Sequence, residues 1–140
     1  MEKTSIYLDT NIIADAIDPL REGHKKSISI LKFCILHDIS ISTSEDILTT
    51  LYYISRDKMA TLKFIQNIIL VEWNILTFGI KVIQNATTLS AEKNLDLEDV
   101  LQCLCAKENG CKILITNDKK FYNCGLEILS TEAFLDKYHD

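Results

Sequence analysis

Acidic residues stand where apolar, strand-like segments of this sequence end. Asp9 follows SIYL, Glu45 and Asp46 follow a second such segment, and Asp118 comes shortly after ILIT. Asp99 lies near the start of a helix-like segment, LEDVLQCLCAKE. Carboxylates gathered in one cleft repel one another and raise one another's pKa, and a bound divalent cation offsets this repulsion. Oxygen ligands suit Mg²⁺ or Mn²⁺, and such a cation hydrolyses phosphodiesters by lowering the pKa of a bound water.

The same acids also fit a second interpretation, as helix caps. Asp is a favoured N-cap, and acids in the first helical turn complement the helix dipole. Ser, Thr or Asn would cap equally well, so capping does not require an acid each time. Asp9 needs more than capping, because an acid that ends a buried strand costs desolvation. The capping candidates are Asp9, Ser44 with Glu45 and Asp46 behind it, the Asp96–Asp99 pair, and Asp118.

Strand-like segments alternate with amphipathic helices along the whole chain. This rhythm favours an α/β fold with a mainly parallel sheet and helices on both faces. In such folds the crevice outside the carboxyl ends of the strands is the expected site, which would bring the acids to one edge. Strands are expected at residues 5–8, 39–43, 70–76 (irregular), 112–116 and 127–129, and helices at about 11–18, 24–37, 45–57, 59–68, 79–93, 97–109 and 131–138.

Length, charge and composition bound the class of protein. A chain of 140 residues fits a single domain spanning residues 1–140. The net charge of −5 argues against broad, nonspecific nucleic-acid binding but leaves a nuclease open. The sequence contains no uncharged apolar stretch of about 18 residues, which a membrane span would need. The N-terminus lacks a secretory pattern, so a cytoplasmic protein is expected.

The five cysteines follow no metal-binding spacing. Cys103 and Cys105 lie two positions apart with no paired motif beyond them, and most of the five fall in apolar segments. We therefore expect Cys34, Cys103, Cys105, Cys111 and Cys124 to be buried, reduced thiols.

Two segments together resemble the PIN-domain family, in which VapC-type toxins are the best-known small members. They are YLDTNIIADAI near the N-terminus and DLEDVLQCLCAKENGCKILITNDKKF near the C-terminus, and the resemblance covers nearly the whole chain. It implies a three-layer α/β/α sandwich with a metal-dependent endoribonuclease activity that uses Mg²⁺ or Mn²⁺ on RNA. It also implies a homodimer and a cognate antitoxin as partner.

The resemblance assigns roles to residues at both ends of the chain. Asp9, Asp99 and Asp118 match the first, third and fourth acids of the family. Asn11 matches the polar residue that steadies the first Asp, and Thr116 matches the hydroxyl before the last acid.

The second acid is where this sequence departs from the family pattern. The family places a Glu in the first turns of the helix that begins near residue 45, and Thr50 occupies that place here. Asp46 lies one helical turn earlier on the same face and is the first choice for a replacement carboxylate. Glu45 lies about 100° round the helix and is the second choice.

Lysines and aromatic residues carry less specific signals. Lys119 and Lys120, with Lys107 and Lys112 nearby, suit either contacts to RNA phosphates or a solvated surface. A second set of residues, Tyr52, Tyr53 and Trp73, suits either base stacking or packing.

Two other functions compete with the nuclease hypothesis. The missing Glu at Thr50 allows a noncatalytic PIN-like module that binds RNA or protein. Phosphotransfer through Asp9, as in haloacid dehalogenase phosphatases or response-regulator receivers, is the other, although Asn11 stands where such phosphatases have a second Asp.

Overall fold

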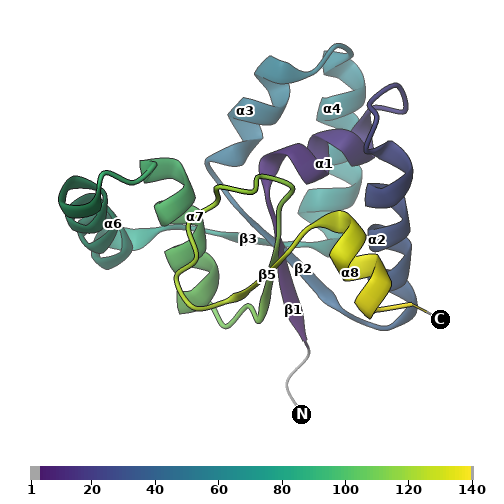
Figure 1. Ribbon diagram of the computed structural model, residues 1–140. Coiled ribbons are helices and arrows are strands. Elements are labelled where there is room, and N and C mark those ends of the chain that lie inside the picture. The colour runs from purple at the N-terminus through teal and green to yellow at the C-terminus, as the bar shows by residue number, and fades with distance from the viewer. Residues whose placement is uncertain (1–3, 140) are drawn as a thin grey trace.

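A sheet of parallel strands runs through the centre of the molecule (Figure 1). The computed structural model describes residues 4–139. The strand order is β3-β2-β1-β4-β5, and every neighbouring pair is parallel. This arrangement confirms the predicted parallel α/β fold with five strands. The strands are β1 (Ser5–Leu8), β2 (Ser40–Ser44), β3 (Asn74–Leu76), β4 (Ile113–Ile115) and β5 (Glu127–Leu129).

Helices cover both faces of the sheet and complete a three-layer α/β/α sandwich. The pair α6–α7 packs on one face, and the group that includes α1, α2, α3, α4 and α8 packs on the other (Figure 1). The helices are α1 (Thr10–Ile17), α2 (His24–Leu36), α3 (Ile47–Ile54), α4 (Lys58–Phe64), the π-helical η1 (Ile65–Ile69), α5 (Leu70–Glu72), α6 (Gly79–Lys93), α7 (Leu97–Glu108) and α8 (Thr131–Lys137).

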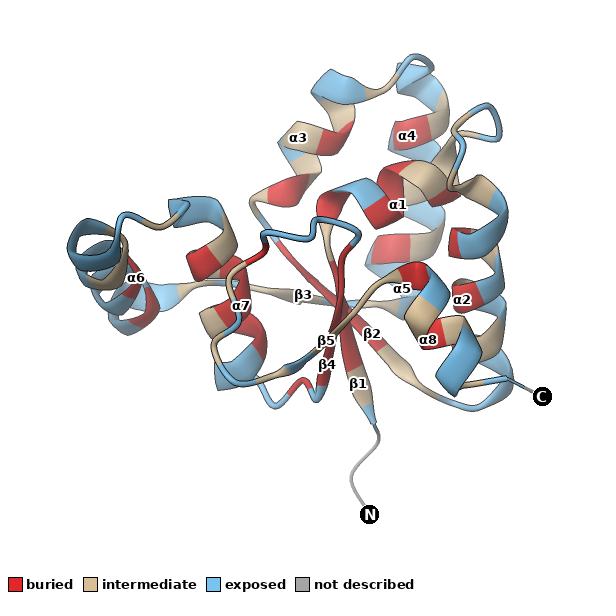
Figure 2. Ribbon diagram, viewed as in Figure 1, coloured by how far each residue is buried: buried red, intermediate tan, exposed pale blue. Residues whose placement is uncertain are grey.

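Alternation along the central strands sends side chains to two separate cores. Ile6 and Leu8 of β1 join the larger core under α1, α2 and α8, whereas Tyr7 joins a smaller core under α7. Leu114 of β4 faces the same side as Tyr7. Figure 2 shows that buried residues concentrate in these central strands. Since successive side chains of a strand point to opposite faces, both layers of helices have an apolar surface to cover.

The predicted irregular strand at residues 70–76 is wrong in its first half. Leu70–Glu72 continue the helical path of η1 as α5, and the amide of Trp73 still donates to the carbonyl of Ile69. Ile69 is fully buried and the Trp73 ring packs edge-on against Phe64. The helical path of η1 therefore continues through Leu70–Glu72 between two packed residues, Ile69 and Trp73, although Leu70 and Val71 are themselves exposed.

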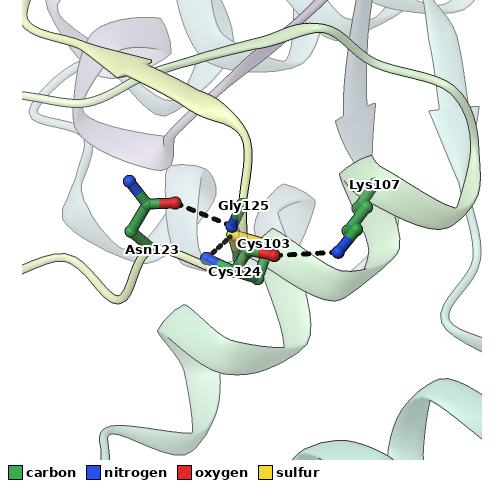
Figure 3. Close-up of a disulfide and its surroundings, with 5 residues drawn as sticks. All are labelled: Cys103, Lys107, Asn123, Cys124 and Gly125. Atoms are coloured by element: carbon green, nitrogen blue, oxygen red, sulfur yellow. Dashed lines mark hydrogen bonds between the residues drawn. A yellow bond between two sulfur atoms is a disulfide. The ribbon is translucent and has the colours of Figure 1, made fainter.

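The expectation of five reduced thiols is also wrong. Cys103 of α7 forms a disulfide with Cys124, which lies in the segment that leads to β5 (Figure 3). The amide of Cys124 also donates to the Cys103 sulfur, and Lys107 donates to the Cys124 carbonyl. The sequence separation of 21 hid this pair, because only the fold brings α7 beside that segment. Cys34, Cys105 and Cys111 are buried free thiols, as expected.

The disulfide gives a direct prediction for thiol counting. Alkylation of the denatured, unreduced protein should label three cysteines, and prior reduction should raise the number to five. Mass spectrometry of the intact protein measures both values. Labelling of all five cysteines without reduction would show that the isolated protein lacks this bond.

No helix within residues 4–139 is long and apolar enough to cross a membrane.

Candidate metal site at the carboxyl edge of the sheet

Four sequence-predicted acids lie around the carboxyl ends of three adjacent strands. Asp9 follows β1, Asp46 follows β2 and begins α3, and Asp118 follows β4. Asp99 lies in the first turn of α7, which packs over the same side of the sheet as Tyr7. The β2-β1-β4 order places the central strand's acid, Asp9, between the other two strand ends.

Asp9 is held by two hydrogen bonds that use different carboxylate oxygens. Its Oδ1 accepts from the amide of Thr10 at 2.7 Å, and its Oδ2 accepts from the Thr116 hydroxyl at 2.7 Å. Burial raises the pKa of Asp9, the two hydrogen bonds counteract that rise, and the charge of Asp118 adds to it. Asp9 therefore caps α1 and also faces a neighbouring acid, so both interpretations of this residue apply.

Asp99 does not cap α7, because Asp96 does. The Asp96 carboxylate accepts from the amide of Asp99 at 3.1 Å, which leaves the Asp99 carboxylate free of capping. The pKa of Asp99 is raised to about 7, first by burial and then by the charges of Asp96, Asp118 and Asp9. Asp99 is thus a carboxylate whose charge is opposed by several others, a situation that a bound cation relieves.

Thr116 links the first and the fourth acid. Its hydroxyl donates to Asp9 and accepts from the amide of Asp118 at 3.1 Å. Asp118 itself accepts from the amide of Lys120 at 2.9 Å and is exposed. The strand end at β4 therefore fixes the positions of two acids through one buried hydroxyl.

The two candidates for the second acid lie in different environments. Asp46 is half-buried and makes no side-chain capping bond to α3, and its charge raises the pKa of Glu98 on α7. Glu45 is exposed, and its amide donates to the carbonyl of Leu76. Thr50 lies one turn into α3 and is half-buried. Asp46 is thus near enough to Glu98 for their charges to interact, and we prefer it to Glu45 as the second acid.

Glu98 is an acid near the site that the sequence reasoning missed. Burial raises its pKa, and the charges of Asp46, Asp9 and Asp96 raise it further, while the hydrogen bond from Gln102 lowers it. The available signal was the density of acids at the start of α7, where Asp96, Glu98 and Asp99 fall within four residues.

The expected role of Asn11 is not reproduced by a hydrogen bond to Asp9. The Asn11 side-chain oxygen accepts from Arg21 at 3.4 Å, and Thr116 supplies the side-chain bond to Asp9. Asn11 is exposed on the first turn of α1.

The donor chemistry of these residues fits a hard cation, although the side chains do not form a ready-made cluster. Within residues 4–139, no three His, Cys, Asp or Glu side chains converge closely enough to count as a metal-holding group. The carboxylates that oppose one another, Asp9, Asp99 and Asp118, are oxygen donors of the type that Mg²⁺ and Mn²⁺ prefer. The carboxylate side chains would therefore have to move on metal binding.

Thr116 offers a test of how the acids are held. Thr116→Val removes the hydroxyl that bonds Asp9 and the Asp118 amide, whereas Thr116→Ser keeps it. Loss of such a supporting bond typically costs about 10- to 100-fold in metal affinity or activity. We expect that loss for Val and near-normal values for Ser, measured as Mn²⁺ affinity by calorimetry. Equal affinities for both variants would show that the hydroxyl does not organise the site.

Comparisons with known proteins agree with this architecture. The family model for the PIN domain matches residues 6–125. Ribonuclease VapC1 of Aquifex aeolicus is 34% identical to the chain over 143 aligned positions, which cover 99% of each protein.

Solved structures share the fold at lower sequence identity. VapBC2 from Rickettsia felis, bound to a DNA fragment from its promoter, superposes with a TM-score of 0.69 at 23% identity. That match covers 91% of this chain and 98% of the other. Mycobacterium tuberculosis VapC20, a sarcin-ricin loop cleaving toxin, gives a TM-score of 0.68 at 13% identity, over 86% and 95% of the two chains. The family match favours the nuclease hypothesis over aspartate-based phosphotransfer. With the model spanning most of the sequence and a relative of this identity over nearly its full length, the chain belongs to the PIN-domain family.

Proposed function

We propose that this protein is a metal-dependent endoribonuclease, the toxin of a VapC-type toxin–antitoxin pair. One observation carries the proposal. Acids that oppose one another's charge, Asp9, Asp99 and Asp118, stand at the carboxyl edge of a PIN fold whose relative over nearly its full length is a ribonuclease.

The acids would hold Mg²⁺ or Mn²⁺, with Asp46 in the place of the second family acid. When bound, the cation lowers the pKa of a water and neutralises charge on the phosphoryl oxygens of the scissile phosphodiester. The chain's own residues keep the carboxylates in place, through Thr116 for Asp9 and through Asp96 for the start of α7. No side-chain nucleophile is required for hydrolysis of this kind.

A hollow of about 840 Å³ beside Asp118 suits the RNA strand. Arg21, Lys26 and Lys119 line it, and Arg21 and Lys26 are paired with two acids of the same lining, Asp15 at 2.7 Å and Glu132 at 3.9 Å. Exposed Lys120 lies beside it along the chain. Contacts to phosphates position a nucleic acid without reading its sequence, so these cations account for binding and not for target choice.

A protein antitoxin is the partner that we propose. The Rickettsia felis relative is a VapBC assembly, and FitAB bound to a DNA fragment shares this fold with a TM-score of 0.66 at 20% identity, over 90% of this chain and 94% of that one. A second hollow of about 840 Å³ lies between α1, α3 and α4, with exposed Leu20 and Ile54 in its lining. Exposed apolar residues of this kind suit a protein partner. We also propose a homodimer.

The decisive experiment is cleavage of a structured RNA pool by the purified, metal-stripped protein. We expect cleavage with Mn²⁺ or Mg²⁺ and none with EDTA. Exposed Glu108 lies at the end of α7 and away from the acids, so Glu108→Gln is the control variant and should cleave normally. Partner or RNA binding without cleavage would favour the noncatalytic module, and a covalent phosphate on Asp9 would favour phosphotransfer.

A further inference from the structure

A buried hydrogen-bond chain connects the core of the sheet to Asp46. The hydroxyl of Tyr7 lies 2.6 Å from the hydroxyl of Ser44, and the Ser44 hydroxyl donates to the Asp46 carboxylate. Tyr7 and Ser44 are both fully buried. A serine hydroxyl has one proton, so when it donates to Asp46 it must accept from Tyr7. The chain therefore runs in one direction, from Tyr7 through Ser44 to the carboxylate.

The strand register explains how three residues from different elements meet. β1 and β2 pair in parallel with Tyr7 opposite Ser42, and Ser44 follows two residues later on the same face of β2. Two residues advance a strand by about 6.6 Å, a distance that the long tyrosine side chain spans. Ser44 is the last residue of β2, and Asp46 precedes the first residue of α3, Ile47. The sheet thus fixes the donor side of the chain rigidly.

Asp46 accepts this bond instead of capping its helix. It stands at the N-cap position of α3 with a helical backbone (φ −63°, ψ −27°), and its side chain makes no capping bond. Ser44, the other capping candidate, directs its hydroxyl to Asp46. Helix capping therefore does not explain why an Asp stands at position 46. Its hydrogen bond from buried Ser44 needs another explanation.

We propose that Tyr7 and Ser44 are positioning residues that hold Asp46 as the second carboxylate of the cation site, in place of the Glu that Thr50 replaces. The proposal rests on the proposed function for the cation but concerns this chain's own side chains. The hydroxyl that Ser44 donates to Asp46 holds the carboxylate in one orientation. Such supporting bonds orient metal ligands and typically change metal affinity by about 10- to 100-fold when lost.

A purely structural role makes a different prediction. A buried tyrosine hydroxyl usually finds a partner, and the Tyr7–Ser44 bond satisfies that need on its own. If this were its whole purpose, substitutions at Tyr7 and Ser44 would change stability and leave metal affinity unchanged.

Calorimetric titration of Mn²⁺ into the metal-stripped protein separates these roles without using RNA. Ser44→Ala should weaken Mn²⁺ binding by about 10-fold or more, and Ser44→Thr should restore it. Tyr7→Phe should weaken it less, because Ser44 still donates to Asp46. The matched control is Ser42→Ala, since Ser42 is a buried serine of the same strand whose hydroxyl bonds Ser5 at 3.1 Å. It should bind Mn²⁺ like the wild type.

A double-mutant cycle tests whether the effect passes through Asp46. In an Asp46→Asn background, Ser44→Ala should cause little further loss, because the carboxylate it serves is gone. The Tyr7→Phe/Ser44→Ala double variant removes both hydroxyls, so it leaves no unpaired buried group and guards against misfolding of the single variant. It should match Ser44→Ala in Mn²⁺ affinity.

The outcomes distinguish this proposal from the proposed function. Mn²⁺ affinity of Ser44→Ala equal to that of Ser42→Ala overturns the positioning role, as does a full additional loss in the Asp46→Asn background. Absence of Mn²⁺ binding by the wild type also overturns it. Failure of RNA cleavage with the Mn²⁺ results as expected would instead count against the ribonuclease alone.

Discussion

RNA cleavage should fall by more than about 100-fold in Asp9→Asn, Asp99→Asn and Asp118→Asn, because each substitution removes a carboxylate from the proposed cation site. Loss of a supporting residue alone costs about 10- to 100-fold, so loss of a ligand should cost at least as much as the upper end of that range. Initial rates on one RNA substrate at saturating Mn²⁺ measure the effect. Asn keeps the shape of Asp, but its amide nitrogen cannot accept, so one of the two hydrogen bonds that Asp9 accepts is lost or reversed.

The two candidates for the second acid, Asp46 and Glu45, can be compared within the same series of variants. Asp46→Asn should be strongly impaired and Glu45→Gln nearly normal, since Asp46 faces α7 and Glu45 is exposed. Glu108→Gln controls for the loss of one negative charge on α7. Full activity of Asp46→Asn together with an inactive Glu45→Gln would transfer the second-acid role to Glu45. Full activity of Asp9→Asn would rule out the proposed site.

The stability of the metal-free protein should fall as pH rises, and Mn²⁺ should reverse that loss. The pKa of Asp99 is raised from 3.8 to about 7, so the folded protein holds its proton more tightly than the unfolded chain. Between those two values the folded state binds more protons, and its stability therefore decreases with increasing pH and levels off above about 7. Mn²⁺ at about 100 times its Kd should add about 2.7 kcal/mol to the free energy of unfolding.

Asp99→Asn should weaken both the pH dependence of stability and the stabilisation by Mn²⁺. In EDTA at pH 8 the variant should melt at a higher temperature than the wild type, because an uncompensated charge has been removed. Its melting temperature should also depend less on pH and respond less to Mn²⁺. Melting curves of both proteins at pH 5.5 and 8, with EDTA or Mn²⁺, provide the measurement. Parallel pH profiles for the two proteins would mean that Asp99 titrates normally.

The sequence by itself determined the order of the main elements, and it predicted three of the acids. Continuous apolar segments such as SIYL and ILIT are typical of parallel strands buried on both faces, and the carboxyl ends of parallel strands meet at one edge of the sheet. That rule predicts that Asp9 and Asp118 lie at the same edge of the sheet. The motifs around Asp9, Asp99 and Asp118 also identified the PIN family, which the comparisons confirm.

Only the tertiary structure decided which atoms serve which neighbours. Whether Asp96 or Asp99 caps α7 depends on side-chain direction, and residue types alone favour both equally. The Cys103–Cys124 disulfide and the Tyr7–Ser44 hydrogen bond join residues that are 21 and 37 positions apart in sequence, so no local pattern predicts them. Sequence periodicity sets which face a residue occupies, but packing between layers sets which partner it meets there.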